Sequence, residues 1–249
     1  MPSIHDALSQ LSQIINYFLM RDSKLSFFAA LYYTMTSRIS QAIDNDRFQD
    51  RARMDAFDGV FASQYLTAVH RCRLRERVPK CWMVSFEESS NPSLVILQHL
   101  LLGINAHINF DLGIALSQMF HTDKEQNAFR SDFDVINDIL AELIDDVQAN
   151  LATVSPSLLL LDQLGGRTDE SLLGFSLSKA RDQAWSFGVA LSFAPSGGRS
   201  LLMRAQDQLV GGFGRMLSHR LLTVSLAPIR STESSDLRAI VRAIQTASQ

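Results

Sequence analysis

The sequence predicts an all-α protein, a single-domain helical bundle built around a central apolar helix at about residues 93–119. Apolar residues recur at steps of three and four along most of the chain, which is the pattern of amphipathic helices. Alternation of apolar and polar residues over five or more positions is nearly absent, so strands are not expected. The composition agrees with a folded chain, because 46% of the 249 residues are hydrophobic and the net charge is only −3.

The first three helices are expected at 4–20, 24–43 and 51–70, each with one apolar stripe. The central helix follows Asn91-Pro92-Ser93. Proline suits the first turn of a helix because its missing N–H is not needed there. The central segment, LVILQHLLLGINAHINFDLGIALSQMF, is apolar nearly all round. Such a helix is expected in the middle of a bundle.

Further helices are expected at 130–150, 170–193 and 200–222, with a loop at 163–167. A short last helix at about 235–247, capped by Ser235, carries an apolar stripe with which it would dock. The stripe consists of Leu237, Ile240, Val241 and Ile244. Because the chain has no internal repeat and no long linker, we expect one domain over residues 1–249.

Composition and motifs exclude several classes of protein. Two cysteines are too few for a disulfide framework or a zinc ribbon, and the near-neutral charge gives no reason to expect nucleic acid. The N-terminus lacks the basic region of a signal peptide, and no apolar run is long enough to span a bilayer. GxSxG, P-loop, GxGxxG and HExxH motifs are absent. The sequence therefore favours a cytoplasmic protein without a transmembrane segment.

The most informative feature is a run of polar residues on the central helix. His107 and Asp111 are one turn apart and share a face, and Asn105 and Asn109 form a second such pair roughly opposite. Gly103 on the same stripe lowers helix propensity by about 1 kcal/mol relative to alanine, so close approach of a helix or a ligand is expected there.

The His107–Asp111 pair suits general acid/base catalysis, because a carboxylate one turn away orients an imidazole and raises its pKa. HxxxD spacing also suits a divalent metal, since it puts one nitrogen and one oxygen on the same side of a helix. The third reading is a buried hydrogen-bond network with no chemical role. On the helix at 130–150, Asn137 and Asp138 are the polar residues closest to its apolar side.

From Gly103 to Leu112 the sequence resembles the helical family called domain of unknown function 5995. Further matching landmarks are Gln98-His99, Phe61-x-x-x-Tyr65, Trp82, Asp132-Phe133, Ile136-Asn137-Asp138-Ile139-Leu140 and Ala184-Trp185. The resemblance covers about residues 25–190 and implies an all-helical single domain. Members of the family often carry a histidine shortly before the Asp-Phe pair. Here Phe129-Arg130-Ser131 stands there, so no metal site that relies on that histidine is expected.

Three functions follow from these patterns. The first is a small-molecule enzyme of lyase or cyclase type with a largely apolar substrate, in which His107 is the acid/base and Asp111 orients it. Asn105, Asn109 and Asn137 would position the substrate. Aromatic residues would line its pocket: Phe57, Phe61, Tyr65 and Phe110.

The second is a metal-dependent hydrolase, whose ligands would come from His107, Asp111, His99, Asp58 and Asp138. The third is a non-catalytic helical binding protein. The sequence requires no cofactor, and a homodimer is compatible with it.

Overall fold

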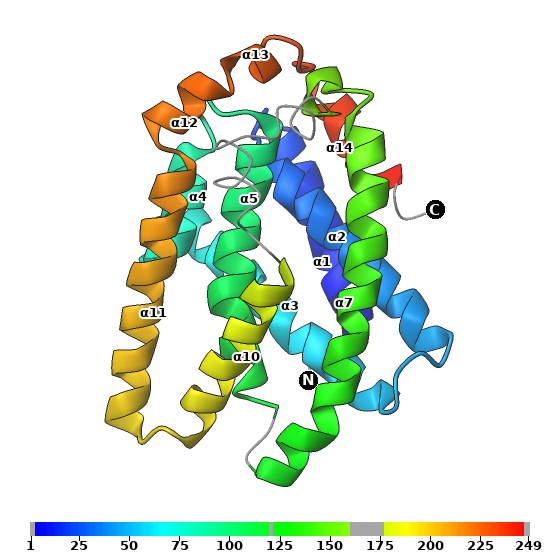
Figure 1. The fold of residues 1–249 in the computed structure, drawn as a ribbon, viewed down its shortest axis with the longest axis vertical. Coiled ribbons are helices and arrows are strands. Elements are labelled where there is room, and N and C mark those ends of the chain that lie inside the picture. Colours follow the sequence, from blue (N-terminus) through cyan, green and yellow to red (C-terminus); the bar gives the residue numbers. More distant parts are fainter. Residues whose placement is uncertain (1–2, 120–121, 160–176, 247–249) are drawn as a thin grey trace.

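The computed structural model describes residues 3–119, 122–159 and 177–246. These residues form helices and contain no strand, so the predicted all-α fold class is confirmed. The chain begins with α1 (Ile4–Leu19), α2 (Leu25–Asp44) and α3 (Arg51–Arg73), as the periodicity predicts. Figure 1 shows α1 and α2 running side by side. A capping box between Ser3 and Asp6 satisfies the first N–H groups of α1.

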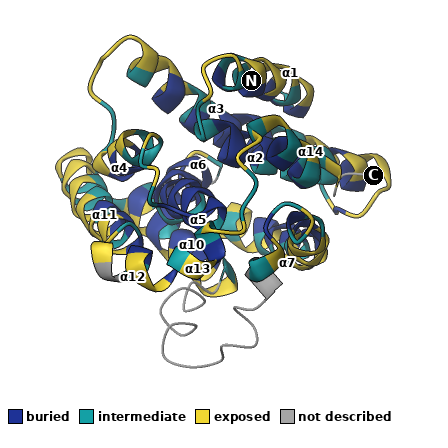
Figure 2. Ribbon diagram, turned by 90° about the horizontal axis from the view of Figure 1, so that it is seen from above, coloured by how far each residue is buried: buried dark blue, intermediate teal, exposed yellow. Residues whose placement is uncertain are grey.

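The predicted central helix consists of three segments, which follow the short helix α4 (Lys80–Glu88). They are α5 (Ile96–Ala106), the π-helix η1 (His107–Asp111) and α6 (Leu112–Leu116). Nearly every side chain of the three is buried, and Figure 2 shows α5 and α6 in the middle of the other helices. The helix starts three residues later than predicted, because Ser93 donates its N–H to the Asn91 side chain in a turn.

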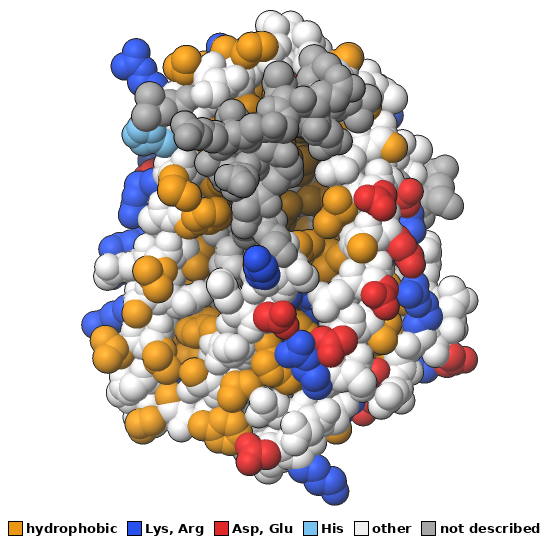
Figure 3. Space-filling view, viewed as in Figure 1, with side chains coloured by type: hydrophobic (Ala, Val, Ile, Leu, Met, Phe, Trp, Pro, Cys, Tyr) orange, Lys and Arg blue, Asp and Glu red, His pale blue; other side chains and the backbone are white. Residues whose placement is uncertain are grey.

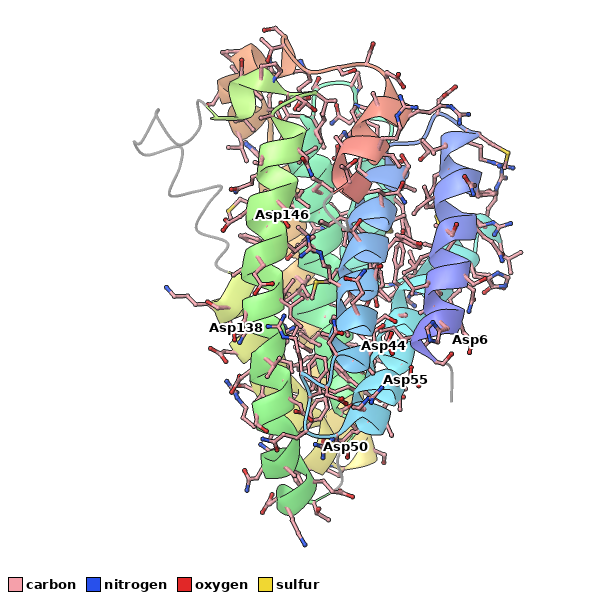
Figure 4. The ribbon with its side chains drawn as sticks, turned by 90° about the vertical axis from the view of Figure 1, so that its right-hand side faces the viewer. Asp6, Asp44, Asp50, Asp55, Asp138 and Asp146 are labelled. Carbon is pink, nitrogen blue, oxygen red and sulfur yellow. The ribbon has the colours of Figure 1, made fainter. Side chains whose placement is uncertain are left out.

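The long helix α7 (Asp123–Leu151) starts seven residues before the predicted 130. Its sequence signal is a capping box, in which Thr122 and Glu125 satisfy each other's N–H groups. An ion pair between Arg38 and Asp146 joins α7 to α2, and Figure 4 shows the two helices alongside each other. A 3₁₀ turn, η2 (Pro156–Leu159), follows α7.

The C-terminal part contains α10 (Leu177–Phe193), α11 (Ser196–Leu217), α12 (Arg220–Ser225), α13 (Ala227–Arg230) and α14 (Leu237–Thr246). The loop predicted at 163–167 and the start of the helix predicted at 170–193 lie outside the described residues. The helix predicted at 200–222 is divided into α11 and α12.

The last helix buries its apolar stripe against α2 and α7, and its N-terminal cap differs from the prediction. The Asp236 carboxylate accepts the N–H groups of Arg238 and Ala239, so the prediction of Ser235 as the cap is wrong. A carboxylate competes well for this position because it also interacts favourably with the helix dipole.

Glycines allow other helices to approach the central helix closely. A Cβ atom on Gly113 would lie 2.3 Å from the Phe187 ring of α10, and one on Gly188 would lie 2.8 Å from Leu116. The α6–α10 contact therefore depends on both glycines. In the described part of the chain, no helix has the length and hydropathy needed to cross a membrane.

Candidate functional site

The predicted polar run coincides with the π-helical turn η1. The backbone follows α-helical bonding up to Ala106 and then widens, so that the N–H of Leu112 donates to the carbonyl of His107, five residues earlier. The sequence predicted an uninterrupted α-helix here. Single π turns inside α-helices are frequent at functional sites, because they redirect side chains that a regular helix would place elsewhere.

His107 and Asp111 are joined as their spacing predicts. The His107 Nδ1 atom lies 3.0 Å from Asp111 Oδ2, and the Trp82 indole donates its N–H to the same oxygen, also at 3.0 Å. Both members of the pair are almost fully buried, with 2% and 3% of their surfaces exposed. One carboxylate oxygen thus accepts two N–H groups, which fixes the orientation of the imidazole.

Aromatic rings from α2, α3 and α4 surround the imidazole. The Phe61 ring stacks on it at 3.8 Å between centroids with an angle of 6°, and the edge contact of Tyr32 is at 4.3 Å. The rings that complete this enclosure are Phe28, Tyr65 and Trp82. Two of the predicted pocket residues, Phe61 and Tyr65, therefore adjoin His107. They pack directly against it instead of lining an open pocket.

The electrostatics of the pair differ from the prediction for His107. Burial lowers the pKa of His107 well below its usual value, where the sequence led us to expect an increase. Burial also raises the pKa of Asp111, although the Trp82 hydrogen bond opposes this shift. The imidazole is accordingly neutral. With Nδ1–H donating to Asp111, Nε2 carries the free lone pair.

Four polar atoms beside the enclosure are buried and lack a hydrogen-bond partner. They are His107 Nε2, Tyr32 Oη, Thr36 Oγ1 and Asp58 Oδ2. Burial raises the pKa of Asp58 to about 7, and the nearby Asp55 carboxylate adds to this. Burial, Asp58 and Asp111 together raise the pKa of Tyr32 well above its usual value, while the neighbouring Thr36 hydroxyl opposes this shift. An unsatisfied buried polar atom costs about 1–3 kcal/mol unless a ligand, a water molecule or a neighbouring hydroxyl satisfies it, and this cluster therefore marks the region as a candidate site.

Three of the residues that form this site were not predicted from the sequence: Tyr32, Thr36 and Trp82. Tyr32 and Thr36 are one turn apart on α2, but hydroxyl groups inside an apolar stripe are common in helices. Trp82 belongs to α4, a helix that the periodicity did not reveal. The one available signal was the unusually polar face of a helix that is otherwise apolar, which requires partners on neighbouring helices.

The Asn105–Asn109 pair faces α11, away from this site. The Asn105 amide donates to the Val210 carbonyl at 3.0 Å, and the Asn109 amide donates to Asn105 Oδ1 at 3.0 Å. Gln206 of α11 in turn donates to the backbone carbonyl of Asn109. The two asparagines are therefore engaged in joining helices, and the structure does not bring them to His107.

Three further predicted residues also lie elsewhere. Asn137 accepts a 2.6 Å hydrogen bond from the buried Arg181, and Asp138 is exposed on α7, where Figure 4 labels it. Phe110 packs on Phe187 of α10. Phe57 stacks on Phe61 and so reaches the site only indirectly.

Gly103 has the close neighbour that its helix position predicted. A Cβ atom there would lie 2.2 Å from the Phe28 ring, which also contacts His107. Glycine at this position therefore lets α2 approach the central helix and bring Tyr32 to the imidazole.

His99, the other buried histidine of this helix, has different surroundings. Its ring meets Phe27 at 6.2 Å, and its Nε2 atom also lacks a partner. Burial and the nearby Lys24 lower its pKa to about 3. No carboxylate hydrogen-bonds to it among the described residues. Nor do three His, Cys, Asp or Glu side chains come together within the described ranges in a group that could hold a metal ion.

A surface hollow of about 150 Å³ lies between α1 and α3, and none of the predicted site residues lines it.

Neither curated proteins nor solved structures give a match to this chain. A family model does match, over residues 4–220, and its description is a family of unknown function, DUF5995. This match covers the site and every helix from α1 to α11. The chain therefore belongs to the DUF5995 family.

Proposed function

We propose that the protein is a small-molecule enzyme of lyase or cyclase type in which His107 is the general acid/base. The observation that carries this proposal is the state of the imidazole: Asp111 holds Nδ1 at 3.0 Å, while Nε2 is buried and has no partner. An oriented, neutral imidazole with a free nitrogen is what a general base requires.

The surrounding residues support a division of labour within such a site. The Tyr32 phenol stays protonated because its pKa is raised, so it can donate a hydrogen bond to an oxygen on which negative charge develops. Asp58, with a pKa of about 7, is a carboxyl group that can give or take a proton near neutrality. In an elimination, Nε2 would take a proton from carbon, the carbon–oxygen bond would break, and the Asp58 carboxyl group would give its proton to the leaving hydroxyl, which departs as water.

The aromatic enclosure supports a substrate with a substantial apolar part. Since Phe61 stacks directly on the imidazole, the substrate would take the place of this ring, and Phe61 would have to swing away. Among the side chains closest to His107, Phe61 is also the most exposed, at 8%, so entry from its side requires the smallest rearrangement.

The metal-dependent alternative would use His107 Nε2 and Asp58 Oδ2, which are the unpartnered donor atoms of the predicted ligand set near this site. It lacks a third charged ligand or histidine among the described residues. The non-catalytic alternative treats the Trp82–Asp111–His107 contacts as internal bracing. Asn105 and Asn109 show what such bracing looks like when every group is satisfied.

The decisive comparison is between His107→Ala and His99→Ala. Both remove a buried imidazole with an unpartnered Nε2, but only His107 is held by a carboxylate. Each variant and the wild type would be incubated with a pool of small apolar metabolites, and conversion followed by mass spectrometry. Loss of general base catalysis lowers rates by roughly 10²–10⁴-fold, so we expect His107→Ala to be inactive and His99→Ala to retain turnover.

Circular dichroism would verify that both variants keep their helices. Full activity of a folded His107→Ala would contradict the proposal. A wild type that converts nothing, with His107→Ala merely less stable, would favour the non-catalytic reading. Activity that disappears on treatment with a chelator and returns with one divalent metal would favour the hydrolase.

A further inference from the structure

The exposed face of α11 combines large apolar side chains with unpaired arginines. Leu201, Leu209 and Met216 are 68%, 71% and 55% exposed, well above what apolar residues of a packed helix show. At about 100° per residue they fall within one quarter of the helix surface, together with the exposed small residues Ala205 and Gly212. The stripe therefore runs the length of the helix.

The charged groups beside this stripe all carry one sign. Arg204 and Arg215 are exposed and border it, and neither forms an ion pair with any described residue. The one acidic residue of α11, Asp207, is turned inward, where its carboxylate accepts the N–H groups of Lys80 and Cys81 at the start of α4. The outer face of α11 is thus apolar and basic, and no acidic side chain of the described residues forms an ion pair with its two arginines.

The position of α11 at the edge of the molecule suits contact with a planar surface better than binding of a peptide. Its inner face packs against α4, α5 and η1, and in Figure 1 it forms the outer edge of the molecule. Figure 3 shows hydrophobic side chains and Lys or Arg side chains along this edge, whereas Asp and Glu gather over α7 on the other side. A protruding helix edge offers no groove for a peptide, but it can lie on a plane.

From these observations we infer that α11 docks the protein on an anionic lipid surface. Its apolar stripe would enter the boundary between headgroups and acyl chains, while Arg204 and Arg215 would contact lipid phosphates. A second copy of the same face is a poor occupant, because it would bring these arginines toward arginines. This inference is independent of the function proposed for His107, since α11 contributes no side chain to that site.

The test is co-sedimentation of the full chain with vesicles. Vesicles of phosphatidylcholine with about 30% phosphatidylserine carry the negative surface, and pure phosphatidylcholine vesicles are the comparison. We expect at least about tenfold stronger partitioning to the anionic vesicles, weakened by high salt because surface charge is screened. Equal binding to both vesicles, or binding to neither, would overturn the inference.

Two variants and one matched control separate the contributions. Leu201→Ser with Leu209→Ser removes the apolar stripe, and Arg204→Glu with Arg215→Glu reverses the charge. Both pairs are exposed, so folding should be unaffected, and each should reduce binding at least about tenfold. Arg238→Glu with Arg242→Glu makes the same charge change on α14, whose apolar stripe is buried, and should leave binding within about twofold of the wild type.

Equal loss of binding in the α14 control would show that net charge, and not the α11 face, is responsible, which would overturn the inference. Gel filtration tests the remaining candidate for covering this face, which is a second copy of the chain. A dimer that dissociates in the Leu201→Ser, Leu209→Ser variant would show that a second copy covers this face instead of lipid.

Discussion

Two faces of the central helix around the π turn η1 carry similar polar residues, but these residues are hydrogen-bonded to different extents. On the α11 side, Asn105 donates a hydrogen bond to the Val210 carbonyl and accepts one from the Asn109 amide. On the side facing α2 and α3, His107 Nε2 is buried without a hydrogen-bond partner. Both faces are mostly buried, so solvent does not account for the difference.

This difference separates a structural polar network from a candidate site. When every group of a buried polar network is hydrogen-bonded, these bonds offset the free energy that the groups lose on leaving water. In a network with unsatisfied groups they do not. The His107 face therefore reduces the stability of the fold, and the Asn105 face supports it. Substitutions on the two faces should accordingly change stability by different amounts, and on the His107 face some should raise it.

The largest effect is expected from Phe61→Ala. Removing the ring that stacks on His107 leaves a cavity, and such changes lower the free energy of unfolding by about 3–5 kcal/mol. Urea denaturation would measure this. Benzene should then shift the His107 resonances in NMR spectra by entering the cavity. The same resonances should not move in Phe110→Ala, because Phe110 packs against Phe187 instead.

Asp111→Ala should follow, with a loss of about 2–4 kcal/mol. It removes the acceptor of both Trp82 Nε1 and His107 Nδ1, and each buried N–H that loses its acceptor costs about 1–3 kcal/mol. The measurement is chemical denaturation monitored by Trp fluorescence. A loss under about 1 kcal/mol would mean that the carboxylate does not anchor this face.

Asn105→Ala should lower stability by about 1–3 kcal/mol, because the Val210 carbonyl and the Asn109 amide each lose a partner. In contrast to substitutions at His107, it should leave any catalytic turnover within a few-fold of the wild type. A variant of normal stability that has lost turnover would place Asn105 in the site and break the comparison between the faces.

Asp58→Asn should raise stability at high pH relative to the wild type, because asparagine stays neutral in the buried site. The raised pKa means that the folded state binds the Asp58 proton more tightly than the unfolded state does, so wild-type stability falls as pH rises from about 4 to about 7. The difference in unfolding free energy between variant and wild type should therefore grow over this range. A difference independent of pH would show that Asp58 titrates normally.

The smallest effect is expected from Tyr32→Phe. Its buried hydroxyl has only the Thr36 hydroxyl beside it, so removing it should leave stability within about 0.5 kcal/mol of the wild type or raise it slightly. If Tyr32 donates to the substrate, turnover should nevertheless fall by at least about tenfold. A clear loss of stability would reveal a hydrogen bond at Tyr32 and weaken the case for a site.

Much of the fold could be predicted because helical periodicity is local. The bounds of α1 and α2 were predicted to within one residue, and the His107–Asp111 contact was predicted from a spacing of four. The short helix α4 was not predicted, since nine residues give too little periodicity to detect. Its absence from the prediction also concealed the role of Trp82 as the second donor to Asp111.

The sequence by itself determined that the chain is helical, which family it belongs to and where polar residues interrupt its most apolar helix. It also determined that Gly103 had to allow a close approach. Only the tertiary structure decided which face of that helix is satisfied and which is not. The reason is physical: spacing along a helix places two side chains together, but a hydrogen-bond partner from α4 or α11 depends on how separate helices pack.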